Sequence, residues 1–447
     1  MNITRRRRSR FIGRLWSHAD FVKLWTGQSI SELGSQVSVL AIPWLAAVGL
    51  HVNPIEFSLL EVLSFLPFIL FALPAGVWVD RLRRRPILIA SDSARAILLM
   101  LIPILWAAGA LRIWNLLALQ FLIGGFTVFF DVGYQAYLPA LVERDDLVDA
   151  NSKLYLTSSV ANVAGPSVAG GLIAAITAPY AILADALSFV VSAVFVLRIH
   201  HDEVLPERDA GEAHPRMWPQ LKEGLAWVIG NRQLRAIAAS SANFNLCFNV
   251  VLAAFILYAV RSLHLSAIEL GAIFAVGSAG AVCGALLANR IQESIGIGPT
   301  IVSSAVLLST GSIAFPLAPR SFAIPVLMFG YGLLSVGVVI YTVAQVSFRQ
   351  AITPERLQGR MSAAMRWIVW GAIPLGTLIG GAIGQTVGLH FALWVGAIGA
   401  LPTFLFVFLS PVRSIHAIPD EVAGSTKAET ERALASLDVA PMSLAEP

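Results

Sequence analysis

The sequence predicts an all-α integral membrane protein whose twelve transmembrane helices form two six-helix bundles related by a parallel repeat. Three observations lead to this fold class. About twelve apolar segments follow one another from Leu24 to Leu409, most of them close to the ~20 residues that cross a bilayer as a helix. Hydrophobic residues make up 57% of the chain and charged residues only 13%, whereas soluble domains contain about 25% charged residues. Matched residues also recur at a fixed separation in the two halves.

The apolar segments are long and continuous, which favours helices over the short alternating strands of a membrane β-barrel. Because lipid offers the backbone no hydrogen-bond partner, each segment is expected to satisfy its own N–H and C=O groups as an α-helix. The expected spans lie at residues 24–50, 56–78, 87–108, 114–138, 153–177, 179–199, 234–260, 267–288, 298–317, 321–347, 361–386 and 389–410. An even number of spans places both termini on the same side of the membrane.

The basic residues indicate which side that is. Of the 31 Lys and Arg residues, 26 fall on the side of the N-terminus, whereas Arg112, Arg261 and Arg320 fall on the other side. The positive-inside rule therefore predicts a multi-pass protein of the cell (plasma) membrane with both termini in the cytoplasm. Because topology accounts for this basic charge, we expect no nucleic-acid partner.

A polar segment after the sixth span divides the chain, and we expect Trp218–Val228 within it to form a helix at the membrane surface. A tail rich in Glu, Ala, Ser and Pro, without periodicity, is expected to be disordered. The expected regions are a basic cytoplasmic N-terminus (1–23), an N-terminal six-helix bundle (24–199), a cytoplasmic linker (200–233), a C-terminal six-helix bundle (234–410) and a cytoplasmic tail (411–447).

The two halves resemble each other at one separation. The following pairs each lie 210 residues apart: Gln135 and Gln345, Leu147 and Leu357, and Gly170–Gly171 and Gly380–Gly381. Six spans repeated in the same orientation predict two bundles related by an axis along the membrane normal. Such bundles enclose a central site and rock about it.

Polar residues inside the first span predict a wall of that central site. Gln28, Ser31 or Glu32, and Ser35 stack on one face of a helix, with Glu32 roughly 10 Å in from the cytoplasmic end at ~1.5 Å per residue. A carboxyl group is costly inside a membrane and needs a partner, water or a purpose. Glu32 is therefore a candidate proton carrier, and the alternative is a structural Glu that is hydrogen-bonded to a neighbouring helix.

The fourth span carries a second candidate. Asp131 is either another proton carrier or the partner of Arg95 in a structural ion pair. Asp92 and Arg95, three residues apart, are expected to pair locally. Asp185 is expected to make a contact between helices.

In the seventh span, Ser241, Asn245 and Asn249 repeat every four residues and match the polar face of the first span in the repeat. Two matched polar faces predict a substrate cavity between the bundles, suited to an amphipathic solute. The candidate cavity residues are Gln28, Ser35, Tyr134, Gln135, Asn245, Asn249, Tyr341 and Gln345. For the aromatic residues, packing against protein or lipid is the competing interpretation.

Two motifs resemble signatures of the major facilitator superfamily. Gly76-x-x-x-Asp80-Arg81-x-x-Arg84-Arg85 resembles its signature between spans two and three, with Arg83 where the pattern has a Gly. Gly165-Pro166-Ser-Val-Ala-Gly170-Gly171 in span five resembles the antiporter signature of its exporters. Shorter segments such as Phe130-Asp131-x-x-x-Gln135 resemble the drug:proton antiporter subfamily, which includes macrolide efflux pumps and the enterobactin exporter.

This resemblance implies the major facilitator fold and proton-coupled export. It also implies that Gly76, Asp80, Arg81, Arg84 and Arg85 form a gate that closes the cytoplasmic side. The alternative is that these arginines only set topology and anchor lipid headgroups. For Gly165, Pro166, Gly170 and Gly171 the resemblance implies a role in antiport, and small-residue packing between helices is the simpler interpretation.

The sequence thus predicts a secondary active exporter of a drug-like or siderophore-like molecule, with protons and membrane lipids as its other partners and a monomeric state. The absence of a G-x-x-x-x-G-K-[ST] loop disfavours an ATP-driven pump, and no nucleophile–base set predicts an enzyme. No metal or cofactor is expected, and Cys247 and Cys283 are expected to be buried apolar residues. A lipid or lysolipid flippase of the same fold and a non-transporting sensor or scaffold are the alternatives.

Overall fold

The computed structural model describes residues 15–79, 82–143, 146–200 and 217–416. Within them, 12 helices are long and apolar enough to cross a membrane, and each coincides with one predicted span. The prediction of twelve membrane helices is therefore confirmed, with ends that differ from the expected ones by several residues. Most of the predicted N-terminus and tail, and residues 201–216 of the predicted linker, lie outside the described residues.

The chain divides into two units, which are described separately. The first unit comprises Met1–Arg208 together with Ile256–Val276, and the second comprises Asp209–Phe255 together with Gly277–Pro447. The end of the seventh span and the beginning of the eighth thus belong to the first unit.

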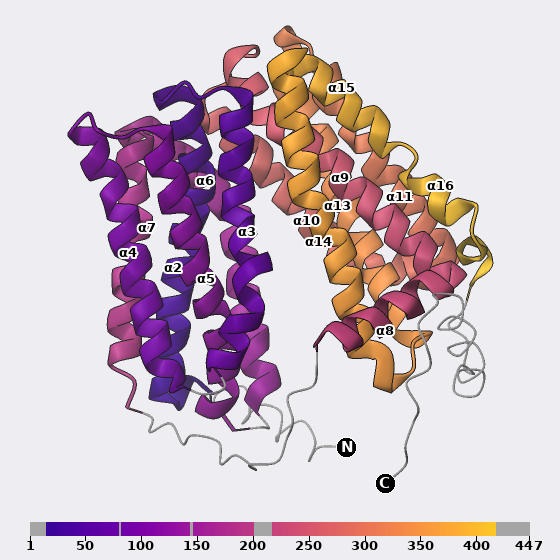
Figure 1. The fold of residues 1–447 in the computed structure, drawn as a ribbon, viewed down its shortest axis with the longest axis horizontal. Helices are drawn as coiled ribbons and strands as arrows, with labels where there is room; N and C mark the ends of the chain where they lie inside the picture. Colours follow the sequence, from indigo (N-terminus) through magenta and orange to yellow (C-terminus); the bar gives the residue numbers. More distant parts are fainter. Residues whose placement is uncertain (1–14, 80–81, 144–145, 201–216, 417–447) are drawn as a thin grey trace, which may run out of the picture. The chain divides into compact units, whose positions relative to one another are not determined.

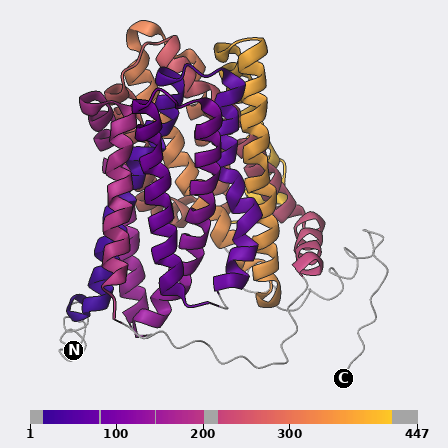
Figure 2. The same cartoon turned by 60° about the vertical axis from the view of Figure 1, so that its left-hand side comes forward.

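Six spans of the first unit run side by side (Figures 1 and 2). They are α2 (Ala19–Trp44, continued by a π-helical turn η2, Leu45–Gly49), α3 (Pro54–Val79), α4 (Arg84–Ala107), α5 (Ile113–Leu141), α6 (Leu147–Ile176) and α7 (Ala178–Leu197). A short 3₁₀ helix, η1 (Leu15–Ser17), precedes them. Among these helices the main contacts run in the order α6, α2, α7, α4, α5 and α3, so α2 lies between α6 and α7.

The second unit repeats this order of helices after a short additional one. Its helices are α8 (Met217–Gly230), α9 (Arg232–Arg261), α10 (Ala267–Ile295), α11 (Ile297–Ser312), α12 (Ala314–Leu317), α13 (Ala323–Ala351), α14 (Glu355–Thr386), α15 (Leu389–Ala400) and α16 (Thr403–Phe408), with 3₁₀ turns η4 (Arg320–Phe322) and η5 (Pro411–Ser414). The last part of α9 and the first part of α10 belong to the first unit. The six long spans thus have counterparts in the same chain order.

Small residues bring helix backbones close together in both units. A Cβ atom added to Gly27 of α2 would lie 3.3 Å from the Cα atom of Ser192 in α7. In the second unit, one added to Gly380 of α14 would lie 2.7 Å from the carbonyl oxygen of Val250 in α9. Because lipid provides no hydrophobic driving force between helices, such close backbone contacts supply the van der Waals packing that holds a membrane bundle together.

A helix, α8, covers the segment Trp218–Val228, and it is attached to the protein; its predicted place at the membrane surface stays a prediction. Glu223 pairs with Arg360 and Arg356 of α14, and Gly224 packs directly against the backbone of Arg360. Ile229, near the end of α8, is exposed. Salt bridges and close packing therefore fix α8 to α14 in the second unit (Figure 1).

Two smaller expectations need correction. Cys247 is buried as predicted, but Cys283 of α10 is exposed. The first residues of the predicted disordered tail are ordered as η5, and the backbone N–H of Gly298 donates to the carbonyl of Ile415 at 2.8 Å. This bond satisfies a donor at the beginning of α11.

Candidate transport site

In the first unit, one polar face of α2 is hydrogen-bonded to α6. The carboxylate of Glu32 accepts from Ser158 Oγ at 3.1 Å, and Gln36 Nε2 donates to Asn162 Oδ1 at 2.9 Å. Glu32 and Gln36 lie four residues apart, as do Ser158 and Asn162, so each pair occupies one face of its helix. The two helices therefore share a polar seam.

A second polar face of α2 contacts α7. Ser35 Oγ lies 3.4 Å from Asp185 Oδ1, and the hydroxyl of Ser38 donates to the other oxygen of the same carboxylate. Ser188 adds a third hydroxyl at 3.3 Å. Asp185 is buried, and its predicted role in a helix–helix contact is confirmed. Although Ser35 and Glu32 are three residues apart, they bond to different neighbouring helices.

Arg95 of α4 is the cation beside several carboxylates in this unit. It pairs with Asp92 on the preceding turn, so the predicted local ion pair is confirmed. The guanidinium carbon lies 4.3 Å from the ring centroid of Phe130 and 4.0 Å from that of Phe189. Asp131 and Asp185 also interact electrostatically with this guanidinium. One buried positive charge thus interacts with three aspartates and also makes cation–π contacts with two aromatic rings.

Asp131 interacts electrostatically both with this cation and with Glu32. Tyr134, one turn further along α5, stacks on Phe130 with ring centroids 5.9 Å apart, and it lies within electrostatic range of Glu32. Two buried polar atoms, Tyr134 OH and Gln28 Oε1, make no hydrogen bond among the residues that the structure describes. Such unsatisfied groups are rare in folded proteins and indicate a place where polar partners bind.

In the second unit, the predicted polar face of α9 is built differently. Asn245 Nδ2 donates to the carbonyl of Ser241 at 2.9 Å, and Asn249 Nδ2 donates to the carbonyl of Asn245 at 2.7 Å. Ser241 Oγ lies 3.1 Å from the hydroxyl of Tyr341 in α13, which brings two predicted residues of the repeat together. The amides thus bond within their own helix.

The two glutamines of the repeat have different environments. Gln135 of α5 is exposed, whereas Gln345 of α13 is only 8% exposed. Within the described part of the chain, Gln345 Oε1 has no hydrogen-bond partner. Of this pair, Gln345 is therefore the better candidate to bind a polar ligand.

Several polar residues that complete these networks were not predicted from the sequence. Ser158 and Asn162 of α6 recur four residues apart, which is the signal that could have identified them. Asn243 of α9 donates to the carbonyl of Gly399 and to Thr403 Oγ1, both at 3.0 Å. Asn243 lies outside the four-residue repeat of its helix, so spacing gave no indication of its contact.

The predicted cytoplasmic gate is only partly described. Asp80 and Arg81 lie outside the described residues, and a Cβ atom on Gly76 would meet nothing within 4 Å. Arg84 begins α4. Arg85 donates to the carbonyls of Val196 and Leu197 at 3.2 Å and 2.6 Å, so it binds the negative end of α7. This contact is structural and leaves the gating role untested.

The antiporter-like segment of α6 is a packing surface of the first unit. Gly165 packs against the side chain of Gln36, and a Cβ atom on Gly170 would lie 2.5 Å from the carbonyl oxygen of Ala267 at the start of α10. The carbonyl of Pro166 in turn meets Gly271 of α10. A Cβ atom on Gly171 would have open space around it. Gly165 and Gly170 are thus required for close packing, which is the simpler of the two interpretations above.

Comparison with known proteins agrees with this architecture. The chain is 24% identical to an uncharacterised transporter of the major facilitator type, YfiS of Bacillus subtilis, over 83% of this chain and 87% of the relative. It is 23% identical to macrolide efflux protein A of Streptococcus pyogenes, over 85% and 93%. It is also 24% identical to the multidrug efflux pump Tap of Mycobacterium tuberculosis, over 81% and 86%.

Solved structures share the fold at low sequence identity. A bacterial homologue of the iron transporter ferroportin, in an inward-facing state, is matched with a TM-score of 0.68 and 16% identity over 87% of this chain and 98% of that chain. The nucleoside transporter NupG is matched with a TM-score of 0.70 and 11% identity over the same shares. These likenesses show the major facilitator fold, with its two six-helix bundles.

The family assignment rests on the length of the sequence match. The model of a family described as transmembrane secretion effector matches residues 15–438, which is nearly the whole chain. Members of the superfamily are membrane transporters, so the prediction that the chain is not an enzyme is confirmed. The chain belongs to the transmembrane secretion effector family of the major facilitator superfamily.

Proposed function

We propose that the chain is a proton-coupled exporter of amphipathic, drug-like molecules that works by alternating access. Its similarity to macrolide and multidrug efflux proteins supports export and the class of substrate. The observation that carries the proposal furthest is the set of carboxyl groups in the first unit. Asp92 forms an ion pair with Arg95, Asp131 and Asp185 interact electrostatically with the same guanidinium, and Glu32 interacts electrostatically with Asp131.

Charge balance in this set supports proton binding. Arg95 forms a direct ion pair with Asp92, and its one positive charge cannot neutralise three further carboxylates. An uncompensated charge inside a membrane protein costs at least ~2.5 kcal/mol on insertion scales. Binding a proton at Glu32 or Asp131 removes such a charge, and these two are the members that the sequence analysis identified as carriers.

Glu32 also offers a route from proton binding to helix movement. Its carboxylate accepts a hydrogen bond from Ser158, and Ser158 lies on α6, the helix that carries the Gly165–Gly171 segment. Protonation weakens a charge-assisted bond to a neutral one, roughly halving its strength. Any state of the transporter that separates α2 from α6 at this seam is therefore favoured when Glu32 is protonated.

The substrate would meet polar groups that are otherwise unsatisfied. Gln28 and Tyr134 in the first unit, and Gln345 in the second, each have a buried oxygen without a hydrogen-bond partner among the described residues. Asn245 and Asn249 add amide oxygens whose own N–H groups are already used. Groups of this kind in an apolar surrounding suit a solute with a few polar or cationic groups.

The test is transport by the purified protein in proteoliposomes with and without an imposed pH gradient. A fluorescent cationic dye and a labelled macrolide serve as substrates. Wild type should accumulate them against their gradient only when the pH gradient is present. Glu32→Gln should remove this coupling while the protein keeps its melting temperature, and Glu293→Gln near the end of α10, which alters an exposed carboxyl outside the set, is the control. Wild-type coupling in Glu32→Gln removes Glu32 from the mechanism.

The same assay decides between this function and the two alternatives. A flippase would translocate a labelled lysolipid without a pH gradient and would not concentrate the dye. A sensor or scaffold would transport none of the compounds. Either result contradicts export driven by protons.

Topology and the gate belong to the same proposal. Both termini lie in the cytoplasm of a monomer in the cell membrane, as the excess of Lys and Arg on that side supports. Gly76, Asp80, Arg81, Arg84 and Arg85 would then close the cytoplasmic side. Labelling of single cysteines at positions 10 and 430 in intact cells tests this topology, and labelling by an impermeant reagent contradicts it.

A further inference from the structure

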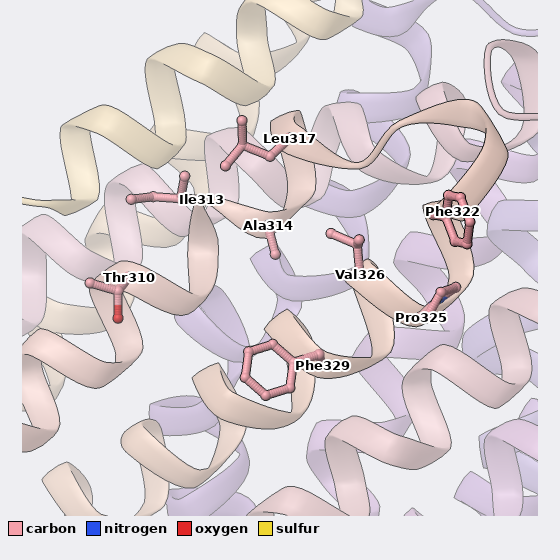
Figure 3. A pocket seen from close by; sticks show the side chains of 8 residues that line it. All are labelled: Thr310, Ile313, Ala314, Leu317, Phe322, Pro325, Val326 and Phe329. Atoms are coloured by element: carbon pink, nitrogen blue, oxygen red, sulfur yellow. The ribbon is translucent and has the colours of Figure 1, made fainter.

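A groove of about 630 Å³ lies in the second unit between α11–α12 and the start of α13 (Figure 3). Seven of its eight lining side chains are apolar. The eight lining residues are Thr310, Ile313, Ala314, Leu317, Phe322, Pro325, Val326 and Phe329. The exception is Thr310. Its hydroxyl donates to the carbonyl of Val306 in its own helix at 2.9 Å, so it needs no hydrogen-bond acceptor in the groove.

The spacing of the lining residues shows that each helix contributes one continuous face. Positions 310, 313, 314 and 317 follow a pattern of three, one and three residues, and positions 322, 325, 326 and 329 follow the same pattern. Residues with this spacing lie on one side of a helix. Two apolar helix faces thus front each other across a space (Figure 3).

A proline and a close contact explain why the faces do not close. Pro316 has no N–H to offer the carbonyl of Ser312, four residues earlier, and its ring crowds that carbonyl. The regular helix α11 ends at Ser312, and α12 begins at Ala314. Gly330 of α13 packs directly against Ala314, so the two helices touch at this point and the groove lies beside it.

The groove belongs to the part of the chain that meets lipid. Its two walls are parts of the candidate spans Ile297–Leu317 and Arg320–Ala351. Phe329 is 72% exposed and Phe322 is 66% exposed, so no other part of the described chain covers this side. At this position in a bilayer the surrounding molecules are lipid chains, which fill an apolar space without losing hydrogen bonds.

A positive charge lies in the loop that joins the two walls of the groove. Arg320 is exposed and begins η4, two residues before Phe322. From Ser294 to Pro354 the sequence contains no Asp or Glu. An anionic headgroup is therefore the complementary partner for this positive charge.

We propose that this groove binds a phospholipid, with one acyl chain between the two apolar helix faces and the headgroup phosphate at Arg320. The lipid belongs to the leaflet nearest to the loop that joins Leu317 to Arg320. It would fill the space left by the break at Pro316 and would stabilise the contact between α11 and α13.

The experiment measures phosphatidylglycerol that remains bound to the full-length protein after detergent washing, by native mass spectrometry. Val326→Trp fills the groove, and Leu286→Trp on α10, at a position that is 71% exposed, is the matched control on another lipid-facing surface. Arg320→Gln removes the charge and Arg320→Lys keeps it. We expect Val326→Trp and Arg320→Gln each to lower retention about fivefold or more, and the two controls to retain the lipid like wild type.

Each other result contradicts the proposal. Equal retention in wild type and Val326→Trp shows that the groove is not the binding place. Equal loss in Arg320→Gln and Arg320→Lys shows that the charge is not the reason. A shift between monomer and dimer in Val326→Trp assigns the groove to a second copy of the chain, and displacement of the lipid by the transported dye assigns it to substrate. If Val326→Trp lowers the melting temperature sharply, the Arg320 pair, which alters an exposed residue, decides alone.

Discussion

The polar face of α2 in the first unit and the polar face of α9 in the second correspond in the repeat, but their side chains bond differently. On α2, Glu32 and Gln36 reach α6, and Ser38 reaches Asp185 of α7. On α9, Asn245 and Asn249 donate to carbonyls of their own helix. The polar residues of α2 connect helices through carboxylates. On α9, Ser241 contacts Tyr341 of α13, but Asn245 and Asn249 present neutral groups that are bonded within their own helix.

This difference indicates how two repeated bundles can have different roles, one in proton binding and the other in solute binding. A proton that binds in the first unit changes bonds between helices, so it can bias their arrangement. A solute that binds at α9 meets amide oxygens whose donors are already used, so it gains hydrogen bonds without breaking contacts between helices. Coupling would therefore depend on the first unit and recognition on the second, which the following variants test.

The largest effect is expected at Arg95. Arg95→Gln leaves Asp92, Asp131 and Asp185 without their shared cation, and losing one partner of a buried ion pair costs about 3–5 kcal/mol. The free energy of unfolding in detergent, from denaturant titration, should fall by this amount. The matched variant in the second unit is Arg366→Gln, whose exposed guanidinium lies 5.4 Å from the ring centroid of Trp370. It should cost less than ~1 kcal/mol. Equal losses in the two variants would contradict the central role of Arg95.

A smaller effect is expected where a serine bonds a carboxylate. Ser38→Ala removes a buried hydroxyl from Asp185, and a hydrogen bond to a charged group contributes about 1.5–3 kcal/mol. Ser240→Ala in the second unit removes a buried bond to the carbonyl of Thr403 at 3.0 Å, and a neutral bond contributes only about 1 kcal/mol. Unfolding measurements on both variants should rank them in this order. The reverse order would show that Asp185 does not depend on Ser38.

The smallest effect on stability is expected at Asn249. Its side chain bonds only the preceding turn of α9 among the described residues, so Asn249→Ala should change the free energy of unfolding by less than ~0.5 kcal/mol. Loss of its amide oxygen should still weaken dye binding about fivefold, corresponding to ~1 kcal/mol. The pH dependence of transport should stay that of wild type. A change in that pH dependence would show that the tasks of the two units are not separate.

Much of the site could be read from spacing along single helices. The pairing of Asp92 with Arg95 follows from a separation of three residues, and the alignment of Ser241, Asn245 and Asn249 follows from a separation of four. The meeting of Ser241 with Tyr341 was expected only as two parts of one repeat-related cavity, and their hydroxyls lie 3.1 Å apart. In the first two cases a helix of known period fixes the relation before any neighbour is known, whereas Ser241 and Tyr341 lie on different helices.

Spacing could not say which neighbour a polar face would meet. Glu32 and Ser35 share a face by their separation, yet one bonds α6 and the other α7. Cys283 is as apolar as Cys247, yet it is exposed while Cys247 is buried. These outcomes depend on the rotation of each helix about its axis, which is set by close contacts such as that of Gly27 with Ser192.

By itself, the sequence determined that this chain crosses a membrane about twelve times, that its halves repeat, and that acidic and amide residues lie within the spans. Lipid enforces these features locally, because each span must be apolar and must satisfy its own backbone. Only the tertiary structure decided that Arg95 serves three aspartates, that α8 is bound to α14, and that two apolar faces leave a groove beside Pro316. These features join residues that are distant in the chain, so they exist only once the helices have packed.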